Sequence, residues 1–220
     1  MEIFSVLKFT FKRFYEDLFK LALLSIIWFI ISASLLFLIF IGLNSGWYFL
    51  LLLPLLFLGP IFLTFLYAGN QILTKGSTSF KSLLVFLKAN FGRGFFIFIV
   101  SITLYIIFIV DLRFFLIKGQ ANIWLLAFAF LFAYLIIYFS VYQAYIWSLL
   151  VIQQNRNLKE ICKNALVLSL DNIIFSLIWF LAIFLLIIVL TIIGIGLPLG
   201  FIGIIGLLML QGTKTMLGKY

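Results

Sequence analysis

Long apolar runs alternate with short basic segments along the whole chain. A bilayer core about 30 Å thick needs roughly 20 apolar residues in a helix, and six runs approach or exceed that length. They cover about residues 21–43, 47–73, 94–110, 123–152, 173–193 and 197–211. The pattern predicts an all-α polytopic membrane protein with six transmembrane helices in three hairpins, forming one integral membrane domain over residues 1–220. Glycine and proline between the last two runs predict a tight turn there.

The basic segments that precede the hairpins are amphipathic. Each places lysines on one helical face and apolar side chains on the opposite face. The lysines are Lys8, Lys12 and Lys20 in the first segment, Lys81 and Lys88 in the second, and Lys159 and Lys163 in the third. The chain thus predicts three units, each an amphipathic helix followed by two spans. A threefold internal repeat explains this order, and so does the ordinary design of membrane proteins built from hairpins.

Composition and charge exclude soluble classes of protein. Hydrophobic residues make up 66% of the chain and charged residues 10%, against about 45–50% and 25% in ordinary globular proteins. Of the 15 basic residues, 13 fall on one side of the predicted membrane, and only Arg113 and Lys118 fall on the other. Basic loops face the cytoplasm, so we expect both termini on the cytoplasmic side of the membrane. The net charge of +9 therefore needs no nucleic-acid partner.

The residue types needed for common catalytic chemistry are scarce. The chain has no histidine, its one cysteine is Cys162, and none of its acidic residues lies in the middle of an apolar run. This excludes a zinc site of His and Cys ligands and a Ser-His-Asp triad. A proton relay normally needs a carboxylate at membrane depth. We therefore expect a non-enzymatic protein without a metal or cofactor.

A stripe of tyrosines in the fourth run is the most specific feature of the sequence. Its members are Tyr134, Tyr138, Tyr142 and Tyr145. With Gln143 nearby, they could line a ligand cavity, or their hydroxyls could bond to neighbouring helices, which we favour. Pro54 and Pro60 in the second run predict kinks, which either line such a cavity or are passively tolerated.

Two further sets of residues are candidates for contacts outside the chain. Gly196, Gly200 and Gly203 share a narrow arc of the last run and predict close helix approach. Packing within the monomer is favoured over a dimer or partner face. The second set consists of Lys81, Lys88, Lys159 and Lys163, which are candidate contacts for a partner or for lipid headgroups.

Several short motifs occur in a familiar order. Gly59-Pro60 is followed by Phe80-Lys81 and Asn90-Phe91, then by Asn157-Leu158-Lys159 and Lys163-Asn164-Ala165-Leu166. Over about residues 5–215, this order resembles the YesL-like family, also called the domain-of-unknown-function 624 proteins. The resemblance implies a six-span bacterial inner-membrane protein, of a kind often encoded beside carbohydrate ABC-transporter components.

The function predicted from these features is that of an accessory component. It would contact the lipid bilayer and a carbohydrate transporter or another membrane complex, with homo-oligomerisation left open. The alternative is a membrane transport subunit that binds a small solute between the tyrosines of the fourth run and the kinked second run. An enzyme acting on lipid is disfavoured, because histidines and clustered acids are missing.

Overall fold

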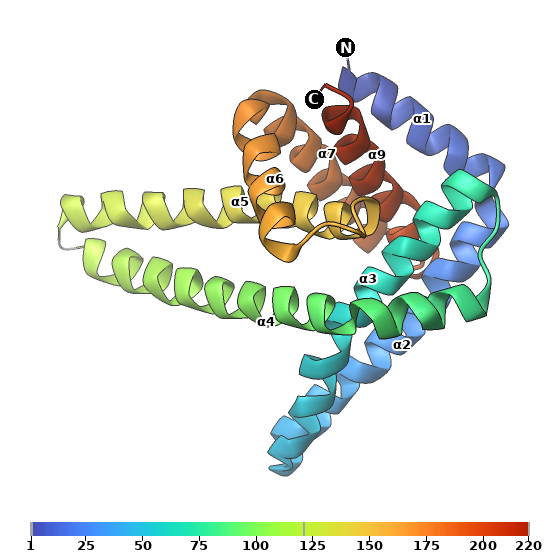
Figure 1. The fold of residues 1–220 in the computed structure, drawn as a ribbon. Coiled ribbons are helices and arrows are strands. Elements are labelled where there is room, and N and C mark those ends of the chain that lie inside the picture. The colour runs from blue at the N-terminus through green and yellow to red at the C-terminus, as the bar shows by residue number, and fades with distance from the viewer. Residues whose placement is uncertain (1, 121, 220) are drawn as a thin grey trace.

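The computed structural model describes residues 2–120 and 122–219, and its elements are helical (Figure 1). They are α1 (Glu2–Glu16), α2 (Leu18–Ser45), the 3₁₀ turn η1 (Tyr48–Leu51), α3 (Leu52–Lys75), α4 (Phe80–Gly119), α5 (Ile123–Ile152), α6 (Leu158–Asp171), α7 (Ile173–Ile192), α8 (Gly196–Gly200), the π-helical turn η2 (Phe201–Gly206) and α9 (Leu207–Leu217). Within the described residues, six stretches are long and apolar enough to cross a membrane. The predicted fold class is confirmed: this is an all-α polytopic membrane protein.

The amphipathic segments join their spans in two different ways. Asp17 separates α1 from α2 with φ −111° and ψ 26°, and Asn172 separates α6 from α7 with φ −121° and ψ 44°. In the second unit, the amphipathic segment and the third span instead form one helix of 40 residues, α4. At the corresponding point of α4, the Asn90 amide donates to the Phe86 carbonyl (3.2 Å) and the helix continues.

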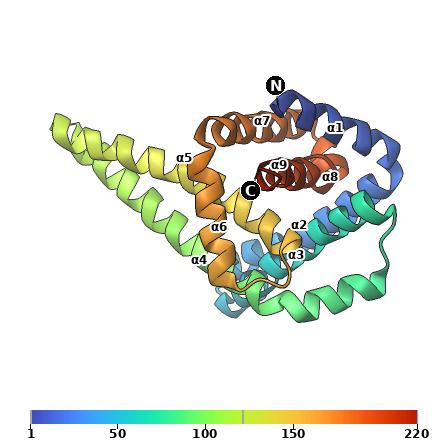
Figure 2. The same ribbon diagram turned by 45° about the horizontal axis from the view of Figure 1, so that its top comes forward.

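The three units are arranged in a ring. The first unit comprises α1 to α3, the second comprises α4 and α5, and the third comprises α6 to α9. The second spans of the units, which contain α3, α5 and α9, contact one another. Each amphipathic segment packs on the second span of the unit before it, and that of the first unit packs on the third unit (Figure 2). The start of α4 thus lies against α3, α6 lies against α5, and α1 lies against α9. The contact between α1 and α9 joins the two ends of the chain and closes the ring. This cyclic order supports an internal repeat.

Three contacts between units occupy matching positions. They lie four residues after Asp17, Asn90 and Asn172, where the first span of each unit meets the second span of the unit before it. The contacting pairs are Leu21 with Gly203, Gly94 with Pro60, and Ser176 with Tyr145. Small side chains at two of these crossings let the helix backbones approach closely.

The two prolines of the second run have different effects. Pro54 lies in the first turn of α3, where its missing N–H costs no helical hydrogen bond. Pro60 lies inside α3, and the Thr64 hydroxyl donates to its carbonyl (2.8 Å). Of the two prolines, only Pro60 therefore lies in the interior of the helix, and α3 runs unbroken from Leu52 to Lys75. The predicted tight turn before the last span is confirmed at Gly194, which has φ 72°.

The outer halves of α4 and α5 form an arm, residues 100–119 and 123–137, that projects away from the other helices (Figures 1 and 2). Its two helices are joined by aromatic contacts. The Phe115 ring lies 5.4 Å from the Phe128 ring and 5.5 Å from the Phe132 ring, centroid to centroid. Near the tip, a Cβ on Gly119 would lie 3.0 Å from the Leu126 Cα, so the backbones almost touch. The arm is therefore a tightly packed helical pair.

Candidate functional site

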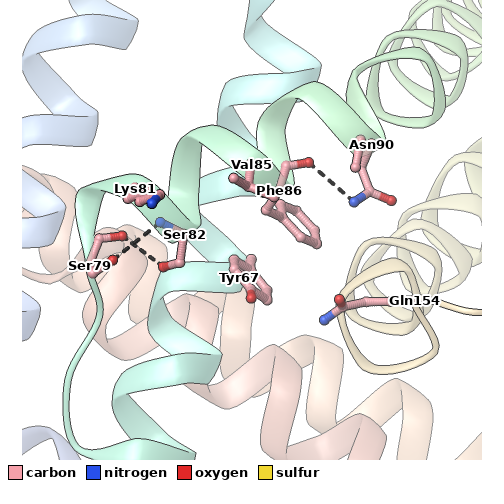
Figure 3. Close-up of a pocket in the computed structure, with 9 residues that line it drawn as sticks. Tyr67, Ser79, Lys81, Ser82, Val85, Phe86, Asn90 and Gln154 are labelled. Carbon is pink, nitrogen blue, oxygen red and sulfur yellow. Dashed lines mark hydrogen bonds between the residues drawn. The ribbon is translucent and has the colours of Figure 1, made fainter.

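A polar pocket of about 410 Å³ lies where the second half of α3 meets the start of α4 (Figure 3). This volume falls within the range of about 300–1,000 Å³ that is usual for ligand pockets. The lining residues are Tyr67, Ser79, Lys81, Ser82, Val85, Phe86, Ala89, Asn90 and Gln154. Most of them come from one face of the first three turns of α4.

The loop between α3 and α4 places two serines at one edge of the polar pocket. Helix α3 ends at Lys75, and the next residue, Gly76, has a φ of 72° that allows the chain to reverse direction. Ser79 then caps α4, because its Oγ accepts a hydrogen bond from the Ser82 backbone N–H (3.2 Å). The loop sequence therefore fixes both hydroxyls at the start of the helix.

A buried glutamine supports this edge from behind. The Gln71 Oε1 accepts hydrogen bonds from the hydroxyls of Thr78 (2.9 Å) and Ser82 (3.1 Å), and its Nε2 donates to the Tyr67 hydroxyl. The Tyr67 ring stacks on Phe86 with centroids 3.9 Å apart and planes inclined by 4°. This gives the pocket a fixed aromatic wall.

The opposite edge is formed by amide groups and an arginine. The Arg93 guanidinium donates to the Gln154 carbonyl (2.8 Å) and to the Asn90 Oδ1 (3.5 Å). These bonds tie α4 to the loop between α5 and α6. Because Lys81 lines the pocket and Arg93 lies directly behind two lining residues, the local charge is positive.

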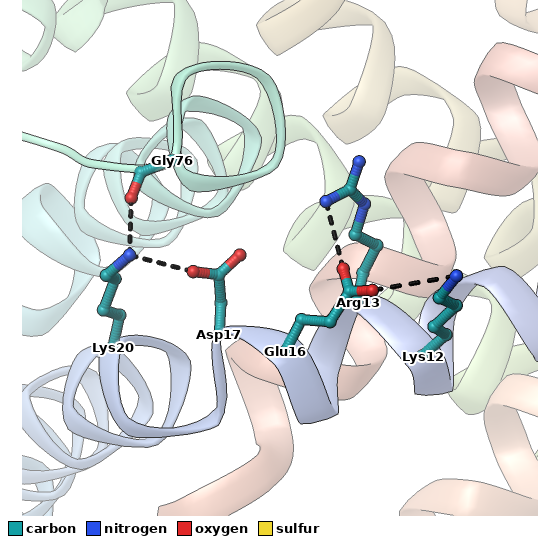
Figure 4. Close-up of polar contacts among 6 residues, drawn as sticks. All are labelled: Lys12, Arg13, Glu16, Asp17, Lys20 and Gly76. Atoms are coloured by element: carbon teal, nitrogen blue, oxygen red, sulfur yellow. Dashed lines mark hydrogen bonds and ion pairs between the residues drawn. The ribbon is translucent and has the colours of Figure 1, made fainter.

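Acidic residues at the junction of α1 and α2 are neutralised by neighbours on their own helices (Figure 4). The Lys20 Nζ lies 2.9 Å from the Asp17 Oδ1 and donates to the Gly76 carbonyl at 2.7 Å. The Glu16 carboxylate pairs with Arg13 (3.1 Å) and Lys12 (3.8 Å). The Lys20 contacts therefore fasten the α1–α2 junction to the loop that leads into the polar pocket.

The structure places three of the predicted tyrosines in a seam between α5 and its neighbours α6 and α7. The bonds run from Tyr138 to Ser169 Oγ (2.9 Å), from Tyr142 to the Cys162 carbonyl (3.3 Å) and from Tyr145 to Ser176 Oγ (2.8 Å). Tyr134 is half exposed and stacks with Tyr138. Gln143 is buried, and its Oε1 has no hydrogen-bond partner among the described residues. None of these side chains lines the polar pocket.

This seam gives a direct prediction. Changing Tyr145 to phenylalanine removes the hydroxyl that meets Ser176 and keeps the aromatic packing. We expect about 1 kcal/mol of lost stability, because hydrogen bonds between transmembrane helices are worth roughly 0.6–2 kcal/mol. Thermal unfolding in mild detergent measures this loss. Tyr134→Phe, on the exposed end of the stripe, is the matched control, and equal melting temperatures for the two variants would contradict a structural role for the seam.

The predicted glycine face is covered by other parts of the same chain. A Cβ on Gly196 or Gly200 would meet Leu190 of α7. The Gly203 N–H donates to Ser25 Oγ of α2 (2.9 Å), and a Cβ at this position would touch the Phe14 ring of α1. All three glycines are buried.

Of the four candidate lysines, Lys81 lines the polar pocket. Lys88 lies two turns further along α4, and Lys159 and Lys163 lie on α6; all three are exposed. The pocket residues Tyr67, Ser79, Ser82 and Gln154 were not predicted from the sequence, and Asn90 entered only as part of the Asn90-Phe91 motif. One sequence feature could have indicated the pocket: residues 76–79, a glycine followed by three hydroxyl residues. Such a segment predicts a helix cap whose hydroxyls lie close to the following lysine, Lys81.

Comparison of the chain with family models, with curated proteins and with solved structures gave no match. The resemblance to the YesL-like family therefore stays a prediction.

Proposed function

We propose that this polytopic membrane protein is a non-enzymatic accessory component of a bacterial inner-membrane complex and docks on its partner through the arm. The resemblance to the YesL-like family favours a carbohydrate transporter as that partner. The observation that carries the proposal is the projection of the arm beyond the other helices, with both of its helices open along their outer faces (Figure 1).

The outer surface of the arm is apolar and accessible. Ile106 and Val110 of α4 are 57% and 59% exposed, and Phe130 of α5 is 70% exposed. Helices in a membrane associate through close packing and hydrogen bonds rather than through the hydrophobic effect. A helical pair that is already fixed by its own aromatic contacts loses little conformational freedom when a partner packs on it.

The charge distribution supports a cytoplasmic position for the amphipathic segments and for both termini. Of the 15 Lys and Arg residues, 13 fall on one side of the predicted membrane, among them Lys81, Lys159 and Lys163. Basic residues favour the cytoplasmic surface. In this orientation, α1, the start of α4 and α6 lie at the inner membrane surface, where they add contacts to the bilayer and to the partner.

The alternative, a solute-binding transport subunit with a tyrosine-lined site, has less support. The hydroxyls of Tyr138, Tyr142 and Tyr145 already contact α6 or α7. A ligand at this seam would have to replace those bonds. Pro60 also faces Gly94 at a helix crossing, which leaves little space beside this proline.

Native co-purification tests the docking role. The protein is extracted from its host's membranes into native nanodiscs, and bound proteins are quantified by mass spectrometry. We expect a stoichiometric membrane partner, retained by the wild type and reduced at least tenfold by Val110→Trp, which adds bulk to the arm. Leu185→Trp, at a 52% exposed position of α7, is the matched control and should keep the partner. Equal recovery with both variants would contradict docking through the arm.

A further inference from the structure

We propose that the polar pocket between α3 and α4 binds a phosphate ester. Lys81, the Ser79 cap of α4 and the side-chain amides of Asn90 and Gln154 would hold it. This site is separate from the arm and does not depend on the docking role. The ligand chemistry follows from an excess of hydrogen-bond donors and positive charge over acceptors and negative charge in the lining.

The donors converge from both edges of the pocket (Figure 3). The Ser79 Oγ accepts from the Ser82 N–H, so its own proton can be donated to a ligand. The Asn90 side chain, only 8% exposed, uses one amide N–H on the Phe86 carbonyl and keeps the other. The Gln154 amide similarly uses one N–H on the Val151 carbonyl. The Tyr67 hydroxyl accepts from Gln71 and can donate its proton.

The charge in the pocket also favours a phosphate ester. Lys81 contributes an ammonium group with three donors, and Arg93 stands behind Asn90 and Gln154. The lining residues include neither aspartate nor glutamate. A neutral sugar donates and accepts hydrogen bonds and carries no charge, whereas the ionised phosphate group of an ester offers acceptor oxygens and negative charge. The lining therefore matches the phosphate ester better.

The position of the pocket allows two sources of that group. It lies at the end of α3 that the basic residues assign to the inner membrane surface, at the level of lipid headgroups. Its aromatic wall of Tyr67 and Phe86 suits the carbon skeleton next to the phosphate. The ligand is thus either the phosphoglycerol headgroup of an anionic lipid or a soluble phosphate ester of similar size.

The test uses the purified full chain in phosphatidylcholine nanodiscs. Inorganic phosphate and glycerol phosphate are titrated at constant ionic strength while thermal unfolding is followed by tryptophan fluorescence. In a parallel measurement, the chain is placed in nanodiscs that contain both phosphatidylglycerol and phosphatidylcholine, and native mass spectrometry compares how much of each lipid it retains. A rise in melting temperature with glycerol phosphate identifies a soluble ester. Selective retention of phosphatidylglycerol identifies a lipid headgroup, and either result supports the phosphate chemistry.

Two variants and one control connect the binding to the pocket. Lys81→Gln removes the ammonium group and should weaken binding about tenfold, as expected for a lost charge-assisted hydrogen bond. Gln154→Glu keeps the size of an exposed side chain, adds negative charge and should abolish binding, so the test does not depend on one variant. Lys163→Gln on α6 removes the same charge away from the pocket and should bind normally. Equal binding by all three variants would overturn the proposal. So would the lack of any response to glycerol phosphate together with equal retention of phosphatidylglycerol and phosphatidylcholine.

Discussion

Gly59→Ala is expected to cost at least about 3 kcal/mol of stability, at the upper end of the range for overpacked cores. Gly59 of α3 crosses α4 at Gly94. A Cβ added at Gly59 would lie 2.5 Å from the Gly94 carbonyl oxygen and would also overlap the Phe98 Cβ. Because one contacting atom belongs to the backbone, no side-chain rotation can relieve the clash, and the two helices would have to separate.

Thermal unfolding in mild detergent, together with the yield of folded protein from membranes, measures this effect. Gly92→Ala is the matched control in α4, because a Cβ there meets nothing within 4 Å. Alanine favours a helix by about 1 kcal/mol over glycine, so the control should be neutral or slightly stabilising. A Gly59→Ala protein that unfolds like the control would show that α3 and α4 do not cross at this point.

Gly212→Ala is expected to cost about 2–3 kcal/mol through displacement of a buried indole. Trp179 of α7 is fully buried, and its Nε1 donates to the Leu208 carbonyl of α9 (3.1 Å). A Cβ on Gly212 would overlap that Nε1 and lie 2.5 Å from Cε2. The ring would have to leave its place, which breaks the bond to Leu208 and disturbs its contact with Tyr145, 4.9 Å away between centroids.

A double-mutant cycle isolates this contact. Trp179→Phe has a smaller ring and leaves space for the alanine methyl group. The double variant should therefore be more stable than the sum of the single losses predicts, by about 1 kcal/mol or more, as expected for residues in contact. Strict additivity of the two losses would contradict the packing of Trp179 on Gly212.

The number and order of the membrane spans could be predicted because they depend on local patterns. Apolar runs define the spans, and lysines such as Lys159 and Lys163 mark a helical face opposite apolar positions. Asp17 and Asn172 also mark real boundaries between an amphipathic helix and a span. Asn90 occupies the corresponding place, but its side chain bonds back to the Phe86 carbonyl within a continuous helix. The residue type therefore did not reveal whether the helix ends.

The polar pocket could not be predicted because it depends on contacts between distant segments. Tyr67 and Gln154 belong to different units and meet only through the cyclic packing of the helices. The tyrosine stripe was visible in the sequence as a helical periodicity. The hydroxyl partners on α6 and α7, among them Ser169 and Ser176, became clear only from the placement of those helices.

The two proposals would give the two ends of α4 different roles. Residues near Val110 present an apolar surface, on which we propose that another membrane protein docks. The start of α4, with Lys81 and Ser79, presents donors and positive charge at the other end of the same helix. Because α4 runs unbroken over 40 residues, a ligand in the pocket and a partner on the arm would contact one rigid element.

Photo-crosslinking from the arm tests the docking role most directly. A photoreactive phenylalanine analogue is placed at Val110 of the arm or at Leu185 of α7, and adducts formed in the host's own membranes are identified by mass spectrometry. Docking through the arm predicts one discrete adduct with another multi-span protein from position 110 and none from position 185. Lipid adducts alone at both positions, or an adduct only with a second copy of this chain, would contradict it.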